Sequence, residues 1–265
     1  MVMHMENAIQ NYDMMIEALD ELRSETRKAQ TIPVPGVPDL ADILEEIEPL
    51  PREALLLGLA SDGLPVLLNL NDPRPGPLLI AADPGAGKTA LLQFIALAGG
   101  RIHSIESLQF GVITNYPEEW EQIADHPQNM GIFPTYHNKA IDFLHTLSGW
   151  AHSRKGAQKS ALLLIDDLES MEHLNFEDRQ VLRWLLFRGP SRRVWPVVTM
   201  NASRLEQVRT WLEAFRTRIF GLIRDNQKAA SLTGMSWTPL DQLQGGVQFA
   251  LREDDEWLKF WTPQI

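Results

Sequence analysis

The sequence predicts an α/β fold in which a mostly parallel sheet carries helices on both faces. Apolar segments of strand length alternate with helical patterns through the middle of the chain, as in βαβ units. One such strand, residues 78–82, leads directly into a glycine-containing turn and an amphipathic helix. Another, residues 161–165, is apolar throughout, which is typical of a strand buried on both faces of a parallel sheet.

The turn that follows Ala82 fits the phosphate-binding P-loop pattern, with this alanine where the first glycine is usual. Gly85 and Gly87 allow a tight turn that brings main-chain N–H groups close to phosphate oxygens. The next helix directs its positive dipole end at the same place. Lys88 adds a cation, and the Thr89 hydroxyl can ligate Mg²⁺. We therefore expect an ATP and Mg²⁺ site with the nucleotide-binding residues Asp83, Pro84, Gly85, Ala86, Gly87, Lys88, Thr89 and Ala90.

Two carboxylates, Asp166 and Asp167, end the apolar strand that begins at residue 161. An acid pair at the carboxyl end of a parallel strand can hold Mg²⁺ and polarise water beside a P-loop. We predict that Asp166 and Thr89 are the metal ligands and that Asp167 orients water. A strand end followed by a helix cap would look the same, and Glu169 is a second candidate for the base.

Composition and charge exclude several kinds of site and partner. The 265-residue chain has no cysteine, which excludes disulfides, thiol catalysis and cysteine metal sites. It has no run of 18 apolar residues and no signal-peptide pattern, so we expect a cytoplasmic protein without a membrane segment of its own. The net charge of −11 disfavours a general nucleic-acid binder. Ten arginines and two acidic residues nevertheless lie in residues 179–224, either as solvated faces or as a surface for phosphates or an acidic partner.

Residues 1–50 are expected to form a helical N-terminal appendage and linker, and residues 51–265 the P-loop ATPase domain. Residues 6–28 carry apolar side chains every three or four positions with acids between them, which predicts a helix. Residues 31–38 contain three prolines and a glycine, so they cannot continue that helix. A short helix with Asp39 as its N-cap should follow. The apolar face of the first helix packs either on its own domain or on another chain.

Turn residues and periodicity place the remaining elements. An Asp62-Gly63 turn predicts a hairpin, and Pro65 places its second strand at a sheet edge. The expected strands cover residues 54–60, 64–70, 108–114, 132–133, 197–200 and 218–223. Pro196 should mark the start of the strand over 197–200. A final hairpin should pair residues 246–251 with residues 257–261. The expected helices run from 89 to a stop at Gly99-Gly100 and over 139–154, 176–187, 204–215 and 225–234. The expected N-caps are Asn175, Ser203 and Asp225.

Four short segments outside the P-loop and the acid pair carry a family resemblance. They are residues 58–66, 198–201, 215–219 and 243–248. In this order they are similar to the G-x-D-x-x-G-x-P-V lead-in, the polar sensor strand, the x-x-T-R-I segment and the L-x-G-x-G stretch of the FtsK/SpoIIIE branch of the HerA–FtsK P-loop ATPases. The resemblance runs from about Leu57 to the C-terminus. It departs from the family in the displaced aspartate of the lead-in, in Asp167 where glutamate is usual, and in Met200 or Asn201 where the sensor glutamine is expected.

This resemblance implies a RecA-like motor core that works as a homo-oligomeric ring, usually a hexamer, with ATP bound between subunits. It implies ATP hydrolysis with Mg²⁺, and DNA is one candidate for the translocated polymer. The implied γ-phosphate sensor is Asn201 or Thr199. Either Arg216 or Arg218 would act as an arginine finger on the nucleotide of a neighbouring subunit. The predicted catalytic residues are Lys88, Asp166, Asp167 and Arg218.

Two alternatives to a DNA motor remain open. The double aspartate also resembles some ATPase domains of the type VII secretion motor, which move protein. The short side chain of Asp167 and the missing sensor glutamine favour a nucleotide-dependent binding or regulatory module with little turnover. Steady-state ATPase activity, measured with and without DNA, separates a module of this kind from a motor.

The predicted N-terminal helix generates a test of assembly. If residues 6–28 dock on another chain, a protein that starts at Asp39 should stay folded and assemble less, because the apolar face that holds the contact is gone. Acidic residues of the helix would meet the arginine-rich region, so assembly of the full chain should also weaken with salt, which screens exposed charges over about 8–10 Å. Mass in solution at two salt concentrations measures both effects. A lower melting temperature with an unchanged oligomer distribution would instead show that the helix covers its own domain.

Overall fold

The computed structural model describes residues 39–47, 49–153, 159–253 and 256–263. Contacts divide the chain between residues 36 and 37, and everything described lies on the C-terminal side of this division. The predicted helix over residues 6–28 and the proline-rich linker over 31–38 lie outside the described residues. Within the described ranges, no helix combines the length and hydrophobicity needed to cross a membrane.

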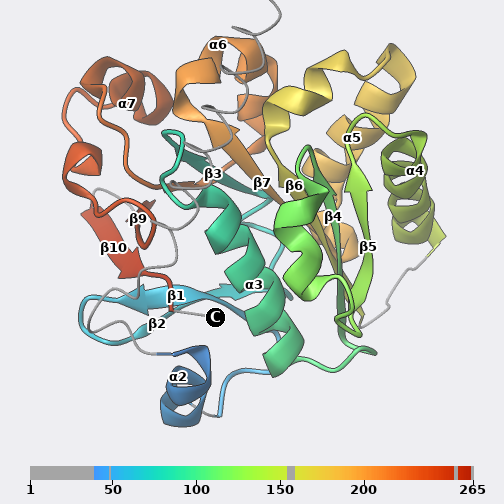
Figure 1. The fold of residues 1–265 in the computed structure, drawn as a ribbon, viewed down its shortest axis with the longest axis horizontal. Coiled ribbons are helices and arrows are strands. Elements are labelled where there is room, and N and C mark those ends of the chain that lie inside the picture. The colour runs from blue at the N-terminus through green and yellow to red at the C-terminus, as the bar shows by residue number, and fades with distance from the viewer. Residues whose placement is uncertain (1–38, 48, 154–158, 254–255, 264–265) are drawn as a thin grey trace, which may run out of the picture. The chain divides into compact units, whose positions relative to one another are not determined.

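Ten strands form one sheet in the order β2-β1-β10-β9-β8-β3-β7-β6-β4-β5 (Figure 1). The neighbours from β8 to β5 pair in parallel, and the other pairings are antiparallel. The parallel part consists of β8 (Thr217–Phe220), β3 (Leu78–Ala82), β7 (Val194–Asn201), β6 (Ser160–Asp166), β4 (Leu108–Thr114) and β5 (Asn129–Pro134). The antiparallel part consists of β9 (Gln248–Glu253), β10 (Glu256–Trp261), β1 (Ala54–Ala60) and β2 (Pro65–Asn69). The predicted α/β class with a parallel core is confirmed.

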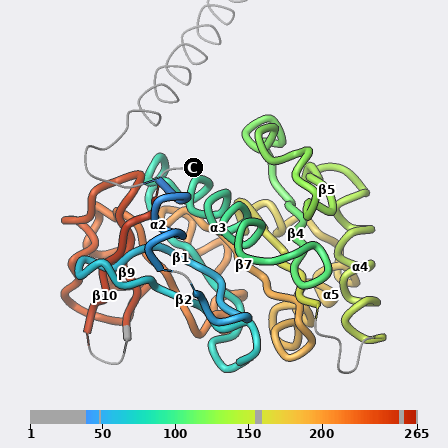
Figure 2. Tube along the Cα trace, turned by 90° about the horizontal axis from the view of Figure 1, so that it is seen from below, coloured from blue at the N-terminus to red at the C-terminus, as the bar shows by residue number. Residues whose placement is uncertain are grey.

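Helices cover both faces of this sheet, and α3 runs across its front in Figure 1; Figure 2 shows the same elements from below. Successive residues of β3 alternate between the two cores, because side chains of a strand point to opposite faces. Leu78 and Ile80 pack in the core that includes α3, whereas Leu79 and Ala81 pack in the core that includes α4 and α5. The α-helices are α2 (Leu40–Ile47), α3 (Lys88–Ile102), α4 (Asn138–Ser153), α5 (Phe176–Arg188), α6 (Leu205–Val208) and α7 (Asn226–Thr233). The 3-10 helices are η1 (Pro117–Ile123), η2 (Leu168–His173), η3 (Pro190–Arg192), η4 (Ala202–Arg204), η5 (Arg209–Ala214) and η6 (Leu240–Gln242).

Several local predictions are confirmed. The first hairpin forms, and β2, which begins at Pro65, is an edge strand. The final hairpin pairs β9 with β10. Asn175 caps α5 by accepting from the Asp178 N–H at 2.9 Å, and Asp225 caps α7. The helix α2 buries Leu40 and Ile43 in the core that contains α3, so it packs with the P-loop strand. The division of the chain at residue 50 stays a prediction.

The predicted stop of the P-loop helix at Gly99-Gly100 is wrong, because α3 continues to Ile102. Both glycines lie where the helix approaches its neighbours closely. A Cβ on Gly99 would lie 2.8 Å from the Leu108 side chain, and one on Gly100 would lie 2.4 Å from the His126 ring. Small residues are therefore needed here for packing, and they do not end the helix.

The segment after β7 also differs from its prediction. The expected helix over residues 204–215 is three short elements, η4, α6 and η5. Its cap is Asn201, whose Oδ1 accepts from the Ser203 N–H at 3.0 Å, and Ser203 itself makes no capping bond. Pro196 lies inside β7 and not at its start. The ladder with β3 begins only at Val197, so that ladder loses no hydrogen bond to the proline.

The arginine-rich region forms many contacts inside its own chain. Five of its ten arginines bond to described groups, namely Arg179 with Glu172, Arg183 with Glu213, Arg193 with Glu53, Arg209 with Glu206, and Arg218 with main-chain carbonyls. The positive charge that remains for a partner is therefore smaller than the sequence alone suggests.

Candidate active site

Three adjacent strands bring the predicted polar segments to one edge of the sheet. Ala82 of β3 lies opposite Asn201 of β7, and Ile165 of β6 lies opposite Val198 of β7. The P-loop, Asn201 and the acid pair therefore all leave the same carboxyl edge of parallel strands. Ligands bind at this edge in open α/β sheets.

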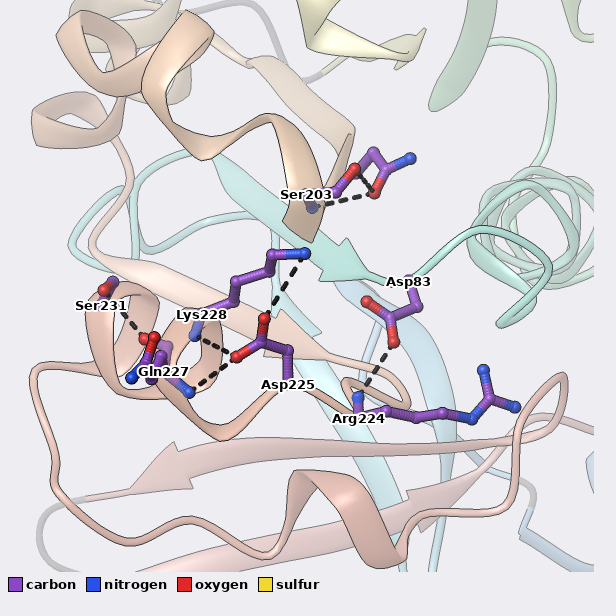
Figure 3. A network of polar contacts seen from close by, with 8 residues as sticks. Asp83, Ser203, Arg224, Asp225, Gln227, Lys228 and Ser231 are labelled. Carbon is purple, nitrogen blue, oxygen red and sulfur yellow. Dashed lines mark hydrogen bonds and ion pairs between the residues drawn. The ribbon is translucent and has the colours of Figure 1, made fainter.

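The P-loop has the backbone that its glycines predict. Gly85 has a φ of 71° and Gly87 a φ of 87°, both in the left-handed region. The Asp83 N–H donates to the Leu222 carbonyl at 2.9 Å, and the Asp83 Oδ2 accepts from the Arg224 N–H at 2.9 Å (Figure 3). These two bonds tie the first residue of the loop to the chain that continues from β8.

A second glycine segment supports the loop from the side of β9. A Cβ on Gly87 would lie 2.5 Å from the carbonyl oxygen of Gly246, so the two main chains touch with no room for a side chain. Gly246 belongs to the segment that resembles the L-x-G-x-G stretch. Position 87 therefore requires glycine for two reasons, the left-handed φ and this close contact.

The Asp166 carboxylate links the P-loop to both neighbouring strands. Its Oδ2 accepts from the Thr89 hydroxyl at 2.9 Å, and its Oδ1 accepts from the Thr199 hydroxyl at 2.8 Å. The Thr199 oxygen in turn accepts from the Asp167 N–H at 2.8 Å. Asp166 is only 3% exposed, and burial, with a smaller contribution from Asp167, raises its pKa to about 6.

These oxygens fit Mg²⁺, which prefers hard oxygen ligands and takes one or two from protein when phosphates supply others. The Thr89 hydroxyl and the Asp166 carboxylate lie within hydrogen-bond distance of each other, so both could ligate a single ion. In the part of the chain that the structure describes, no group of three or more His, Cys, Asp or Glu side chains is arranged around a common metal position. A magnesium ion here would therefore need nucleotide or water as additional ligands.

Lys88 lies inside the site, only 9% exposed, at the first position of α3. Its Nζ donates to the carbonyls of Ala82 and Asp83, at 3.5 and 3.1 Å. Burial lowers the pKa of Lys88, and the charges of Asp167, Asp166 and Glu169 oppose this effect. The ammonium group is thus surrounded by loop carbonyls and carboxylates, where it is placed to meet phosphate oxygens.

Asp167 and the residues around it were only partly predicted from the sequence. Asp167 has a φ of 75°, which is uncommon for an aspartate. Burial raises its pKa, while the charges of Lys88 and Arg204 lower it. Arg204 was not predicted as a site residue, because the sequence around it predicts the start of a helix.

Glu169 contacts Asn201, one of the two predicted sensor residues. Its Oε1 accepts from the Asn201 N–H at 2.5 Å. Its Oε2 is buried and has no hydrogen-bond partner among the described residues. Burial raises the pKa of Glu169, and its hydrogen bond with the Asn201 N–H acts in the opposite direction. The sequence signal for this residue was only an acid two positions after the acid pair.

Arg218 has three partners in its own chain. Its guanidinium donates to the carbonyls of Phe215, Leu232 and Leu212 at 3.2, 2.8 and 3.0 Å. It lies opposite Leu79 in the β8–β3 register, away from the edge that carries the P-loop. Burial lowers its pKa. These contacts argue against Arg218 as an arginine finger, whereas Arg216 is exposed and makes no hydrogen bond or ion pair with the described residues.

Comparison with solved structures confirms the fold that the resemblance implied. The chain is similar to ATPases 2 and 3 of Thermomonospora curvata EccC, in complex with a signal sequence peptide, with a TM-score of 0.64 and 14% identity over 88% of this chain and 44% of that chain. For ATPases 2 and 3 of EssC from Geobacillus thermodenitrificans the TM-score is 0.63 with 14% identity, over 82% of this chain and 48% of that chain. For the pCW3 conjugation coupling protein TcpA, in its monomer form with ATPγS, the TM-score is 0.63 with 12% identity, over 88% of this chain and 71% of that chain.

The chain thus shares the fold of these proteins and spans less than half the length of the EccC and EssC chains it matches. No protein-family model matches the sequence, and no curated protein matches it. At these identities the comparisons establish the fold alone.

The buried carboxylate of Asp166 predicts a pH-dependent stability effect, measured without nucleotide or metal. Its folded pKa of about 6 lies above the ordinary aspartate pKa of 3.8, so the folded state binds this proton more tightly and the ionised carboxylate destabilises the fold above pH 6. The destabilisation shrinks as the pH falls from 6 towards 4. Asp166→Asn should therefore stabilise the protein by up to about 3 kcal/mol at pH 7.5 and by little at pH 4.

Thermal unfolding of both proteins at the two pH values measures this difference. Asp125→Asn, at an exposed position, is the control and should leave stability unchanged at both. A loss of stability in Asp166→Asn that is equal at the two pH values would show that the two threonine hydrogen bonds outweigh the buried charge.

The contact between Gly87 and Gly246 predicts that two similar substitutions in the P-loop differ in their effect. Gly85→Ala adds only backbone strain, because nothing lies within 4 Å of its Cβ. Gly87→Ala adds the same strain and a clash with the Gly246 carbonyl. We expect Gly85→Ala to lower the free energy of unfolding by about 1–2 kcal/mol and Gly87→Ala to lower it clearly more. Chemical denaturation of both variants gives the comparison, and equal losses would contradict it.

Proposed function

We propose that residues 51–265 form an ATP-binding and ATP-hydrolysing motor domain of the FtsK/HerA type. The observation that carries this proposal is the pair of hydrogen bonds that Asp166 accepts from Thr89 and Thr199. They join a P-loop threonine to the acid that ends β6, at the carboxyl edge of the sheet. The fold shared with known ATPases supports the same assignment.

Each predicted residue has a role in this proposal. Lys88 and the N–H groups of the loop would hold the phosphates, and Thr89 with Asp166 would hold Mg²⁺. The bound ion would neutralise charge on the phosphate oxygens. The Thr199 hydroxyl already donates to one aspartate and accepts from the next residue, so it has little capacity for a phosphate.

Asn201 is therefore the better candidate for the γ-phosphate sensor. Its Oδ1 is used by Ser203, while its side-chain amide donates to no described residue. An amide with free donors at the end of β7 can bond a phosphate oxygen or a water. This assignment replaces the sensor glutamine of the family by a shorter amide.

The cargo of the motor is a separate proposal with two candidates. The candidates are a protein and DNA; among proteins of this fold, ATPases 2 and 3 of EccC were solved with a signal sequence peptide, and TcpA is a conjugation coupling protein. The net charge of −11 and the internally paired arginines favour a protein cargo over DNA. A ring of identical subunits, with Arg216 reaching the neighbouring nucleotide, and a cytoplasmic location remain parts of this proposal.

A nucleotide-dependent binding module with little turnover is the second candidate function. The unusual backbone of Asp167 favours it, because this residue stands where the family's catalytic glutamate is expected. ATPase activity in the presence of DNA or a candidate peptide separates the two candidates. A module would bind nucleotide tightly and turn it over no faster when the cargo is added.

Lys88→Ala tests nucleotide binding itself. Removal of the buried ammonium should weaken the affinity for ATP and Mg²⁺ by about 100-fold or more, because a charge-assisted contact to the phosphates is lost. Titration calorimetry with a non-hydrolysable ATP analogue measures the affinity, and circular dichroism checks the fold. Lys228→Ala, an exposed change on α7, is the control. If folded Lys88→Ala binds nucleotide like the wild type, the P-loop assignment is wrong.

A further inference from the structure

Glu169 is a half-buried acid of the site, and the family resemblance assigns it no role. It follows the acid pair in η2, and the family pattern places the catalytic glutamate two positions earlier, where this chain has Asp167. A carboxylate oxygen that is buried without a partner is rare in folded proteins and demands an explanation. For Glu169 that oxygen is Oε2.

The position of Glu169 is defined by three strands. Its side chain leaves the end of β6 and reaches the Asn201 N–H at the end of β7. Asn201 lies in register with Ala82, the last residue of β3 before the P-loop. Since β7 lies between β6 and β3 in the sheet, the Glu169 carboxylate stands between the acid pair and the P-loop.

The hydrogen bond to Asn201 fixes one oxygen of Glu169 and leaves the other available. The Asn201 residue that carries the proposed sensor amide is also the residue whose N–H holds Oε1. The charges of Asp167 and Lys88 both act on Glu169, which places it in the same electrostatic environment as the phosphate-binding lysine. A water bonded to Oε2 would supply the partner that this oxygen lacks.

Asp167 is in a different situation. Its main chain has a left-handed φ, and its N–H is bound to Thr199. Among the described residues, no Asp167 oxygen is buried without a partner, in contrast to Oε2 of Glu169.

We propose that Glu169, and not Asp167, is the carboxylate that orients the attacking water, an inference that rests on the proposed ATPase function. The water oxygen forms a bond to the γ-phosphorus while the bond from this phosphorus to the β,γ-bridging oxygen breaks. The bridging oxygen keeps the electron pair and leaves on ADP. The water proton passes to Glu169 and is then released, with inorganic phosphate as the other product. Asp167 interacts electrostatically with Lys88 and Arg204.

Three matched amide substitutions in the full-length protein test this assignment. They are Glu169→Gln, Asp167→Asn and the control Glu172→Gln, which lies in the same 3-10 helix but contacts Trp211 and Arg179. Gln at position 169 can still accept from the Asn201 N–H, so the fold should persist. We would measure single-turnover ATP hydrolysis with Mg²⁺, and the affinities for a non-hydrolysable ATP analogue and for ADP.

Glu169→Gln should slow hydrolysis by about 100-fold or more. It should also bind the ATP analogue about 5-fold more tightly relative to ADP, because a negative charge close to the γ-phosphate is gone. Asp167→Asn should slow hydrolysis less than Glu169→Gln does, and Glu172→Gln should match the wild type.

Hydrolysis by Glu169→Gln within threefold of the wild-type rate, or a larger loss in Asp167→Asn than in Glu169→Gln, would overturn the inference while leaving the proposed function intact. If the wild type binds nucleotide without turnover, the ratio of analogue to ADP affinity decides. An unchanged ratio in Glu169→Gln then overturns the inference, and the expected increase supports a position beside the γ-phosphate. A wild type that binds no nucleotide would overturn the proposed function and this inference together.

Discussion

The buried carboxylate of Asp166 imposes the strictest physical constraint on this molecule. A charge that is removed from water needs hydrogen bonds or a counter-ion, and otherwise it becomes protonated. Here two threonine hydroxyls, from α3 and β7, supply hydrogen bonds to an acid at the end of β6. Both bonds require that these elements meet at a fixed depth and register. The same register therefore fixes both the alignment of the parallel strands and the geometry of the site.

Much of the fold could be predicted because its signals are local. Continuous apolar runs identified β3, β4 and β6, and the predicted caps Asn175 and Asp225 begin α5 and α7. The errors come from contacts between distant segments. Gly99 lies inside α3, where the nearby Leu108 side chain leaves no room for a Cβ. Asn201 replaces Ser203 as the cap because β7 extends beyond its apolar residues. Neither fact is visible in a short window of sequence.

The same distinction applies to the candidate site. Lys88, Thr89 and Asp166 belong to short motifs, and the structure brings them together as expected. The bond of Glu169 with Asn201 joins residues 32 positions apart, and no spacing rule indicates it. Arg218 shows the opposite case. It belongs to a segment that resembles a family motif, but its guanidinium donates to carbonyls of its own chain. Sequence patterns identify which residues carry chemistry, and only tertiary contacts show how each one is used.

The contact between Gly87 and Gly246 has a mechanical consequence. The two backbones touch without intervening side chains, so they have almost no slack between them. Gly246 precedes β9, which pairs with both β8 and β10, and β10 pairs with β1. A displacement of Gly87 would therefore meet the Gly246 main chain directly, and the paired strands β9, β10 and β1 connect that point to the antiparallel part of the sheet.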